Sequence, residues 1–134
     1  MNIKKIIFGI IAFFLSSFVI QGILGMVIGG DYFMKMPIMR KEPNPMMGMG
    51  ATLIMGVAFS ILYSVSELNG TNLQKGLKFG ILVGLLLVPF LALDIPGRFD
   101  IPDTSKWIII QSSLGFLHFI ISGIAVAFIY NKDS

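Results

Sequence analysis

Four long apolar runs, separated by short polar links, dominate the chain. None of the four contains an acidic side chain, and each approaches or exceeds the roughly 20 apolar residues that a helix needs to cross a bilayer. Lipid offers no hydrogen bonds to peptide groups, so each run must be a helix, and short links make successive helices antiparallel. The pattern predicts an all-α membrane protein, a single domain over residues 1–134 with four transmembrane helices in an up-down antiparallel bundle. The helices are expected at about 6–28, 46–64, 75–93 and 107–130.

The links contain signals for where helices begin and end. Thr71 and Gln74 have the spacing of a capping box, so the third helix is expected to start near Asn72. The longest link, Gly29 to Pro45, is rich in proline and predicts an irregular surface loop with room for a short interfacial turn. The first run is longer than the apolar part of a secretory signal and is expected to be retained as a helix.

The end of the third run combines a proline with a pair of opposite charges. Pro89 removes one backbone donor inside the run, which predicts a kink whose main effect is on the shape of the helix. Asp94 follows at the expected membrane boundary, where it is expected to pair with Arg98 or to cap the helix end. Exposed pairs of this kind usually contribute less than about 1 kcal/mol.

Composition narrows the class of protein mainly by exclusion. Of the 134 residues, 55% are hydrophobic and 13% are charged, whereas soluble domains carry about 25% charged residues. The absence of cysteine excludes disulfides, thiolate metal sites and cysteine nucleophiles. The 10 basic residues are scattered beside apolar runs rather than gathered into a stripe that could follow phosphates. The expected partner is therefore the lipid bilayer and not nucleic acid.

Charge also sets the expected orientation. If the amino terminus is cytoplasmic, basic residues divide equally between the two sides, so the Lys4-Lys5 pair beside the first run decides. We therefore expect a multi-pass protein with both termini in the cytoplasm. Basic residues expected inside are Lys4, Lys5, Lys75, Lys78 and Lys132, and those expected outside are Lys35, Arg40, Lys41, Arg98 and Lys106.

Small residues form periodic faces on two of the runs. Gly76, Gly80 and Gly84 make two overlapping GxxxG motifs, which allow another helix backbone to approach closely. The second run has a comparable stripe of small residues, so the faces of the second and third runs could pack against each other within one chain. We favour packing inside one chain, with contact between chains as the alternative. The stripe consists of Thr52, Gly56, Ser60 and Ser64.

The fourth run holds the only histidine. Gln111, His118 and Ser122 share one narrow helical face with Gly115, which predicts an inward-facing polar strip. An imidazole at membrane depth could relay protons or bind a metal or haem. We favour a structural role, because no second ligand follows at helical spacing.

Methionine and the known catalytic motifs give little further chemistry. Apart from Met1, all methionines lie between Met26 and Met55, where flexible packing explains them better than capture of copper. The chain has no HExxH, no phosphate-binding loop and no carboxylate placed to orient the histidine. We expect neither an enzyme nor a bound cofactor or metal.

A set of short motifs resembles a group of small uncharacterised four-helix bacterial inner-membrane proteins. These motifs are Gly30-Asp31-Tyr32 and the block from Lys75 to Gly80, followed by Gly84 and Pro89. The resemblance implies the four-helix fold and an inner-membrane location, and no activity comes with it. The leading hypothesis is a non-enzymatic membrane component that forms a homo-oligomer or joins a larger membrane complex. The alternative is a small oligomeric transporter or channel for an ion or small solute, with copper as a minor variant.

Overall fold

The structure is a computed structural model that describes residues 2–35 and 45–130. Helices account for 89% of these residues, and no strand occurs among them. The all-α prediction is confirmed. In chain order, the helical elements are α1 (Ile3–Ser17), η1 (Phe18–Leu24), α2 (Gly25–Met34), α3 (Pro45–Val65), α4 (Asn72–Pro89), η2 (Phe90–Asp94), α5 (Ile95–Arg98) and α6 (Thr104–Tyr130).

These elements join into 4 helices that are long and apolar enough to cross a membrane. The first, third and fourth segments extend beyond their predicted runs into more polar residues, and the second exceeds its run only by Val65. An 18-residue stretch of each has a mean hydropathy of 2.3, 1.7, 2.2 and 2.0, in chain order. The four segments are Ile3–Phe33, Met46–Val65, Asn72–Arg98 and Thr104–Tyr130.

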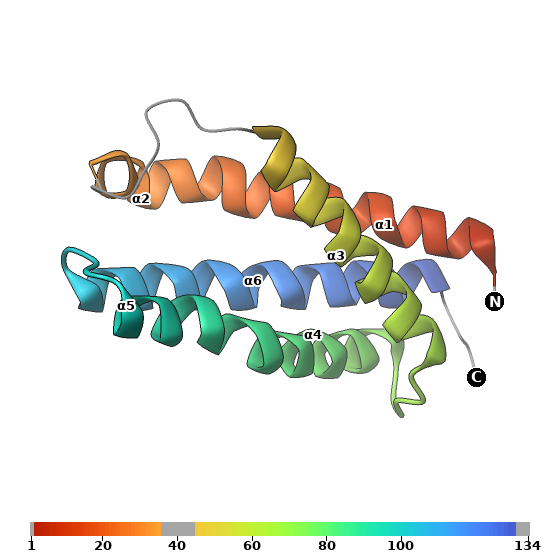
Figure 1. Ribbon diagram of the computed structural model, residues 1–134. Coiled ribbons are helices and arrows are strands. Elements are labelled where there is room, and N and C mark those ends of the chain that lie inside the picture. The colour runs from red at the N-terminus through yellow and green to blue at the C-terminus, as the bar shows by residue number, and fades with distance from the viewer. Residues whose placement is uncertain (1, 36–44, 131–134) are drawn as a thin grey trace.

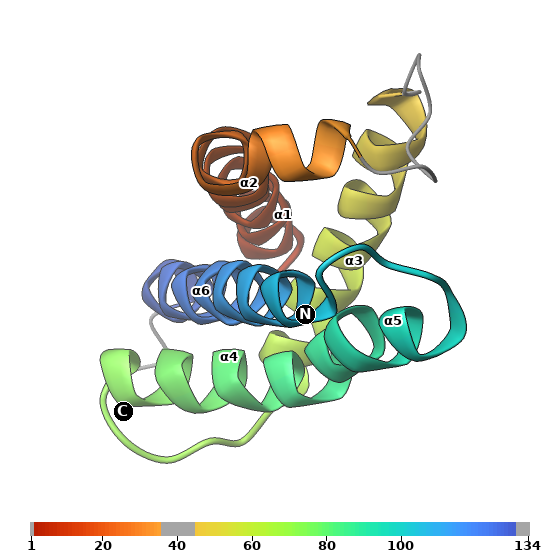
Figure 2. The same ribbon diagram turned by 90° about the vertical axis from the view of Figure 1, so that its left-hand side faces the viewer.

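Helix α6 lies at the centre of the molecule. In the end-on view it runs between α1 and α4, and α3 lies to one side (Figure 2). In its most apolar stretch 44% of the residues are buried, against 17% in the first helical segment. The main core cluster joins all the long helices through Phe13, Phe59, Phe79, Phe119 and Tyr130. The start of α1 and the end of α6 lie at the same end of the molecule (Figure 1).

The glycines of α4 pack directly on the backbone of α6. A Cβ on Gly76 would lie 2.5 Å from Ile124 Cα, and a Cβ on Gly80 would lie 2.5 Å from the carbonyl oxygen of Phe119. Gly123 of α6 meets the same surface, because its Cβ would lie 2.5 Å from the Gly76 carbonyl oxygen. The GxxxG face is therefore occupied within the chain.

The small-residue stripe of α3 meets a different helix from the one expected. The part of the stripe formed by Gly56 and Ser60 packs on α1. A Cβ on Gly56 would lie 3.3 Å from Phe13 Cδ1, and a Cβ on Gly9 of α1 would collide with Ser60 Oγ. The two predicted stripes, on α3 and α4, thus do not face one another. Aromatic rings separate them instead, with Phe59 and Phe79 at a centroid distance of 4.9 Å.

Hydrogen bonds join three helices near the two chain ends. Ser60 Oγ donates to the Ile6 carbonyl over 3.1 Å and lies 3.1 Å from Tyr130 Oη. Tyr130 Oη also donates to the Ser60 carbonyl, and Lys5 Nζ donates to the Tyr130 carbonyl over 2.8 Å. Since Gly9 has no side chain, Ser60 can lie directly against α1. This junction fixes α1, α3 and α6 relative to one another.

At the opposite end, the first helical segment bends at Gly29. Its φ of −131° and ψ of 15° are non-helical, and the helix resumes beyond it as far as Met34. The bend lies next to Ile28, where the first apolar run was expected to end. Beyond it, Tyr32 Oη donates to the Pro102 carbonyl, and Phe33 packs edge-on against Trp107 at 5.8 Å between centroids. Part of the predicted link is thus a docked helical turn, while residues 36–44 lie outside the described residues.

The third helical segment shows the predicted capping box. Thr71 Oγ1 accepts from the Gln74 backbone at 3.2 Å, and Gln74 Oε1 accepts from the Thr71 backbone at 3.0 Å. At the other end, α4 is followed at Pro89 by the π-helical η2. The expected ion pair forms, with Arg98 Nε 3.0 Å from Asp94 Oδ2.

Candidate functional site

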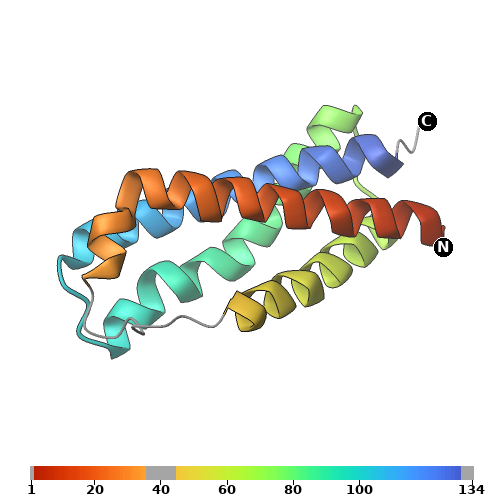
Figure 3. The same cartoon turned by 90° about the horizontal axis from the view of Figure 1, so that it is seen from above.

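The candidate site is a cleft between the first helical segment and the amino-terminal half of α3. The first turns of α3 stand apart from α1 and η1 (Figures 2 and 3). The resulting outer cleft has a volume of about 500 Å³. Its walls are mostly apolar, but small and polar residues of both helices line it. They are Phe14, Ser17, Phe18, Gln21, Gly22, Gly48, Met49 and Thr52.

A second cavity continues the outer cleft toward α6. This inner cavity has a volume of about 420 Å³ and shares Ser17, Gln21 and Thr52 with the outer cleft. Its remaining walls come from every long helical segment, including His118 of α6. The two spaces are therefore neighbours, and the inner one reaches the middle of α6.

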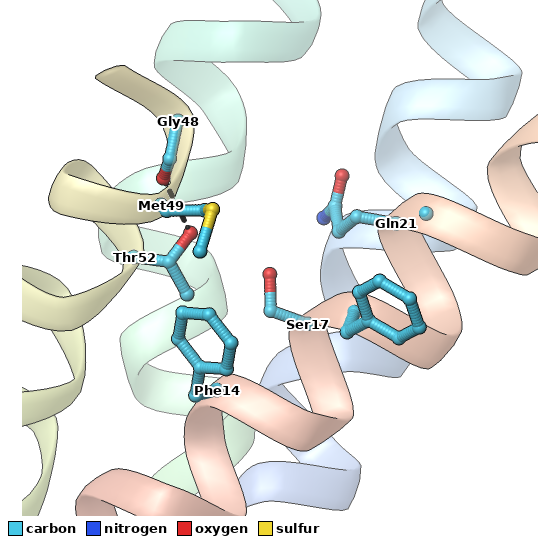
Figure 4. A pocket seen from close by; sticks show the side chains of 8 residues that line it. Phe14, Ser17, Gln21, Gly48, Met49 and Thr52 are labelled. Atoms are coloured by element: carbon cyan, nitrogen blue, oxygen red, sulfur yellow. Dashed lines mark hydrogen bonds between the residues drawn. The ribbon is translucent and has the colours of Figure 1, made fainter. Parts of the chain in front are cut away.

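Three polar side chains lie where the two cavities meet. Ser17 and Gln21 are one helical turn apart on one wall, and Thr52 lies on the other (Figure 4). Thr52 Oγ1 donates to the Gly48 carbonyl of its own helix over 2.9 Å. Gln21 is exposed at this boundary. These groups give an otherwise apolar cleft a local capacity to hydrogen-bond.

His118 lies at the inner end of this path. It is only 3% exposed, and its Nε2 has no hydrogen-bond partner among the described residues. The Phe13 ring packs against the imidazole at a centroid distance of 4.6 Å. Leaving a buried polar nitrogen unpaired costs about 1–3 kcal/mol. An unpaired group that lines a cavity is therefore a candidate for contact with a ligand.

The predicted polar face of α6 does not form one site. His118 lines the inner cavity, whereas Gln111 is half-buried and lines neither cavity. Ser122 is fully buried, and its Oγ has no hydrogen-bond partner among the described residues. The structure instead brings His118 together with Ser17 and Gln21, which the sequence analysis did not identify as site residues. Their i, i+4 spacing was the signal that could have found them.

The residues predicted for helix packing divide in the same way. Gly76, Gly80 and Gly84 contact α6, while Gly56 and Ser60 contact α1. Thr52 lines the cleft instead. The predicted stripe on α3 therefore contacts α1 at Gly56 and Ser60 and borders the open cleft at Thr52.

Both π-helical segments border the inner cavity. Gln21 belongs to η1, and Phe90 and Leu91 belong to η2. Such segments are rare and occur frequently at functional sites, because they widen a helix and re-aim its side chains. Trp107 Nε1 donates to the Leu91 carbonyl over 2.9 Å, which gives a backbone acceptor of η2 a partner.

The described residues contain no group of three or more histidine, cysteine or carboxylate side chains able to hold a metal ion. The methionines at the start of α3 are exposed, at 71% for Met46 and 65% for Met47. Met36 and Met39, which belong to the methionine-rich link, lie outside the described residues. The chemistry available at the cleft is hydrogen bonding and apolar contact.

Comparison with family models, with curated proteins and with solved structures finds no match to this chain.

Proposed function

We propose that the protein is a multi-pass component of the bacterial inner membrane, an up-down antiparallel bundle with both termini in the cytoplasm. Contacts at the two ends of the bundle support the alternation of directions. At one end the Lys5 side chain donates a hydrogen bond to the Tyr130 carbonyl. At the other end, the Tyr32 hydroxyl donates a hydrogen bond to the Pro102 carbonyl, and the Trp107 indole donates one to the Leu91 carbonyl. The lysines near the first end give it a positive charge, as expected of a cytoplasmic face. They include Lys4, Lys5, Lys75 and Lys78.

Its function is that of a non-enzymatic component that pairs with a second copy of itself through α3. The observation that carries this proposal is the uncovered backbone at the start of α3, where Gly48 lies on one side of the helix and Gly50 on another. No atom of the described residues lies within 4 Å of a Cβ built on Gly48 or on Gly50. In lipid, such surfaces favour close contact between helices. The α4 glycines cannot serve this purpose, because α6 already covers them.

A second copy is the occupant that fits this surface best. In a two-fold dimer each α3 would present the same small residues to the other, which is the arrangement that self-complementary helix faces adopt. The neighbouring methionines, Met46, Met47 and Met49, are exposed and flexible enough to pack around the crossing point. A larger membrane complex remains as the other outcome of the same test.

Disulfide cross-linking of Gly48→Cys in native membranes tests this proposal. The chain has no cysteine, so the introduced thiol is the only one. We expect oxidation to give a band at twice the monomer mass. Ile109→Cys is the matched control, because Ile109 is 65% exposed but lies on α6, away from the proposed crossing.

Equal dimer yields from the two variants would contradict pairing through α3. A cross-link of Gly48→Cys to a different protein, with no homodimer, would replace the second copy by a heterologous membrane partner.

One observation favours the alternative of a small transporter. The inner cavity extends from the cleft to His118, the only histidine of the chain. However, Ser122, expected on the same path, is fully buried, and Gln111 lines neither cavity. The transport hypothesis therefore ranks second.

A further inference from the structure

The inner cavity combines mostly apolar walls with one polar side chain, His118, that is only 3% exposed. Its volume of about 420 Å³ is within the range of cavities that bind small molecules. Phe13, Met55, Val88 and Phe119 supply much of the apolar wall. His118 lines the inner side of the cavity, and its buried Nε2 lacks a hydrogen-bond partner among the described residues. Such a cavity fits a molecule with a mainly apolar body and one or a few polar atoms.

The charge of the lining restricts the ligand further. No aspartate, glutamate, lysine or arginine is among the described residues that line either cavity. A charged headgroup would have no opposite charge there, which is costly at membrane depth. A neutral hydroxyl or carbonyl oxygen has no such cost, and a neutral imidazole nitrogen can accept from the first or donate to the second. The ligand is therefore expected to be uncharged.

The route into the cavity indicates where the ligand comes from. The inner cavity meets the outer cleft at Ser17, Gln21 and Thr52, and the outer cleft is bordered by exposed apolar side chains. Phe18 is 61% exposed and Met49 is 47% exposed. Side chains of this kind face lipid in a membrane-spanning bundle. A molecule dissolved in the bilayer could thus enter sideways between η1 and α3.

We propose that the inner cavity is a binding site for a neutral, lipid-soluble molecule whose hydroxyl or carbonyl oxygen hydrogen-bonds with His118 Nε2. The apolar walls hold its body, and Ser17, Gln21 and Thr52 hydrogen-bond with further oxygens near the entrance. The wider turns of η1 and η2 shape the wall on two sides. This proposal goes beyond pairing through α3 and does not rest on it, although Gly48 and Met49 border both the outer cleft and the proposed crossing.

A single-histidine NMR experiment tests the site. Because His118 is the only histidine, labelling histidine with ¹⁵N gives one imidazole spectrum. The protein in lipid nanodiscs is titrated with three probes of matched chain length: 1-dodecanol, dodecane and dodecanoate. We expect 1-dodecanol to shift the Nε2 resonance saturably. Dodecane and dodecanoate should shift it at least about tenfold less effectively, since neither offers a neutral oxygen.

Variants provide a second measurement that does not use the histidine signal. 1-Dodecanol should raise the midpoint of thermal unfolding of the unmodified protein, because a ligand that binds only the folded state stabilises it. His118→Phe should lose this rise. Ser122→Ala should keep it, because Ser122 lies one turn further along α6, is equally buried and does not line the cavity.

The outcomes separate clearly. A saturable Nε2 shift with 1-dodecanol, together with a rise in the unfolding midpoint that is lost in His118→Phe and kept in Ser122→Ala, supports the site. Equal effects of dodecane would overturn the hydrogen bond to His118, and preference for dodecanoate would overturn the neutral headgroup. The absence of a saturable shift with every probe would overturn the site itself. None of these results depends on whether Gly48→Cys forms a dimer.

Discussion

Replacing Gly80 with leucine is expected to destabilise the protein by about 3 kcal/mol or more, the largest effect of any single substitution considered. The Cβ of the new side chain would lie 2.5 Å from the Phe119 carbonyl oxygen and 2.6 Å from Ile120 Cα. These are backbone atoms of α6, so no rotation of a side chain can relieve the collision. The two helices would have to separate and lose the close contact that Gly76 and Gly123 extend on either side.

The fluorescence of Trp107 measures this effect directly. It is the only tryptophan of the chain and packs against Phe33, so its emission reports tertiary contacts. Denaturation of the detergent-solubilised variant by dodecyl sulfate should occur at lower denaturant than in the unmodified protein. Gly97→Leu is the matched control, because none of the described residues lies within 4 Å of a Cβ at Gly97. If the two variants were equally stable, close packing of α4 on α6 would not hold the bundle together.

Replacing Ser60 with leucine is expected to cost about 2–3 kcal/mol, for two reasons that act together. The serine is fully buried and donates to the Ile6 carbonyl, so leucine removes a hydrogen bond between α3 and α1. Leucine is also larger, while the facing position on α1 is Gly9, where even one added carbon would collide with the serine. The substitution should therefore loosen α1 from α3 while leaving the contact of α4 with α6 intact.

Two comparisons separate the packing effect from the hydrogen bond. Ser60→Ala removes the hydroxyl without adding bulk and should cost only about 1 kcal/mol, because Tyr130 Oη keeps its bond to the Ser60 carbonyl. Ala51→Leu places the same new side chain at an exposed position of α3 and should change stability by less than about 0.5 kcal/mol. Dodecyl sulfate denaturation followed by Trp107 fluorescence measures all three. A loss of stability in Ala51→Leu equal to that in Ser60→Leu would contradict this account of the junction.

The sequence predicted the helices well because the bilayer imposes a strong and local rule. Apolar runs of sufficient length must be helical in lipid, and the capping box at Thr71 depends on residues only three positions apart. The end of the first run at Ile28 also had a structural counterpart, the bend at Gly29. Such local signals do not require knowledge of which helices are neighbours.

The partners of the helices could not be predicted in this way. A glycine stripe shows that some backbone comes close, but not which one. Gly76 and Gly80 meet Gly123 of α6, although the stripe of α3 looked equally suitable in sequence. The choice depends on side chains far apart in the chain, such as Phe59 and Phe79, which fill the space between α3 and α4.

The candidate site was predicted only in part for a related reason. His118 is recognisable by its residue type, but Ser17 of α1 and Gln21 of the π-helical η1 line the same cavity only because of how the helices are arranged in space. The 3.6-residue period that placed Gln111 and Ser122 beside His118 describes one helix alone. It contains no information on which polar side chains a neighbouring helix supplies.

The central claim, a four-span membrane protein with both termini in the cytoplasm, is tested most directly by labelling single cysteines in spheroplasts. Asn69→Cys and Asp100→Cys place a thiol at exposed positions in the two described links, between α3 and α4 and between α5 and α6. A membrane-impermeant maleimide should label Asp100→Cys in intact spheroplasts and Asn69→Cys only after the membrane is opened. Labelling of both cysteines from the same side would contradict the four-span arrangement, and the reverse pattern would contradict the cytoplasmic placement of the termini.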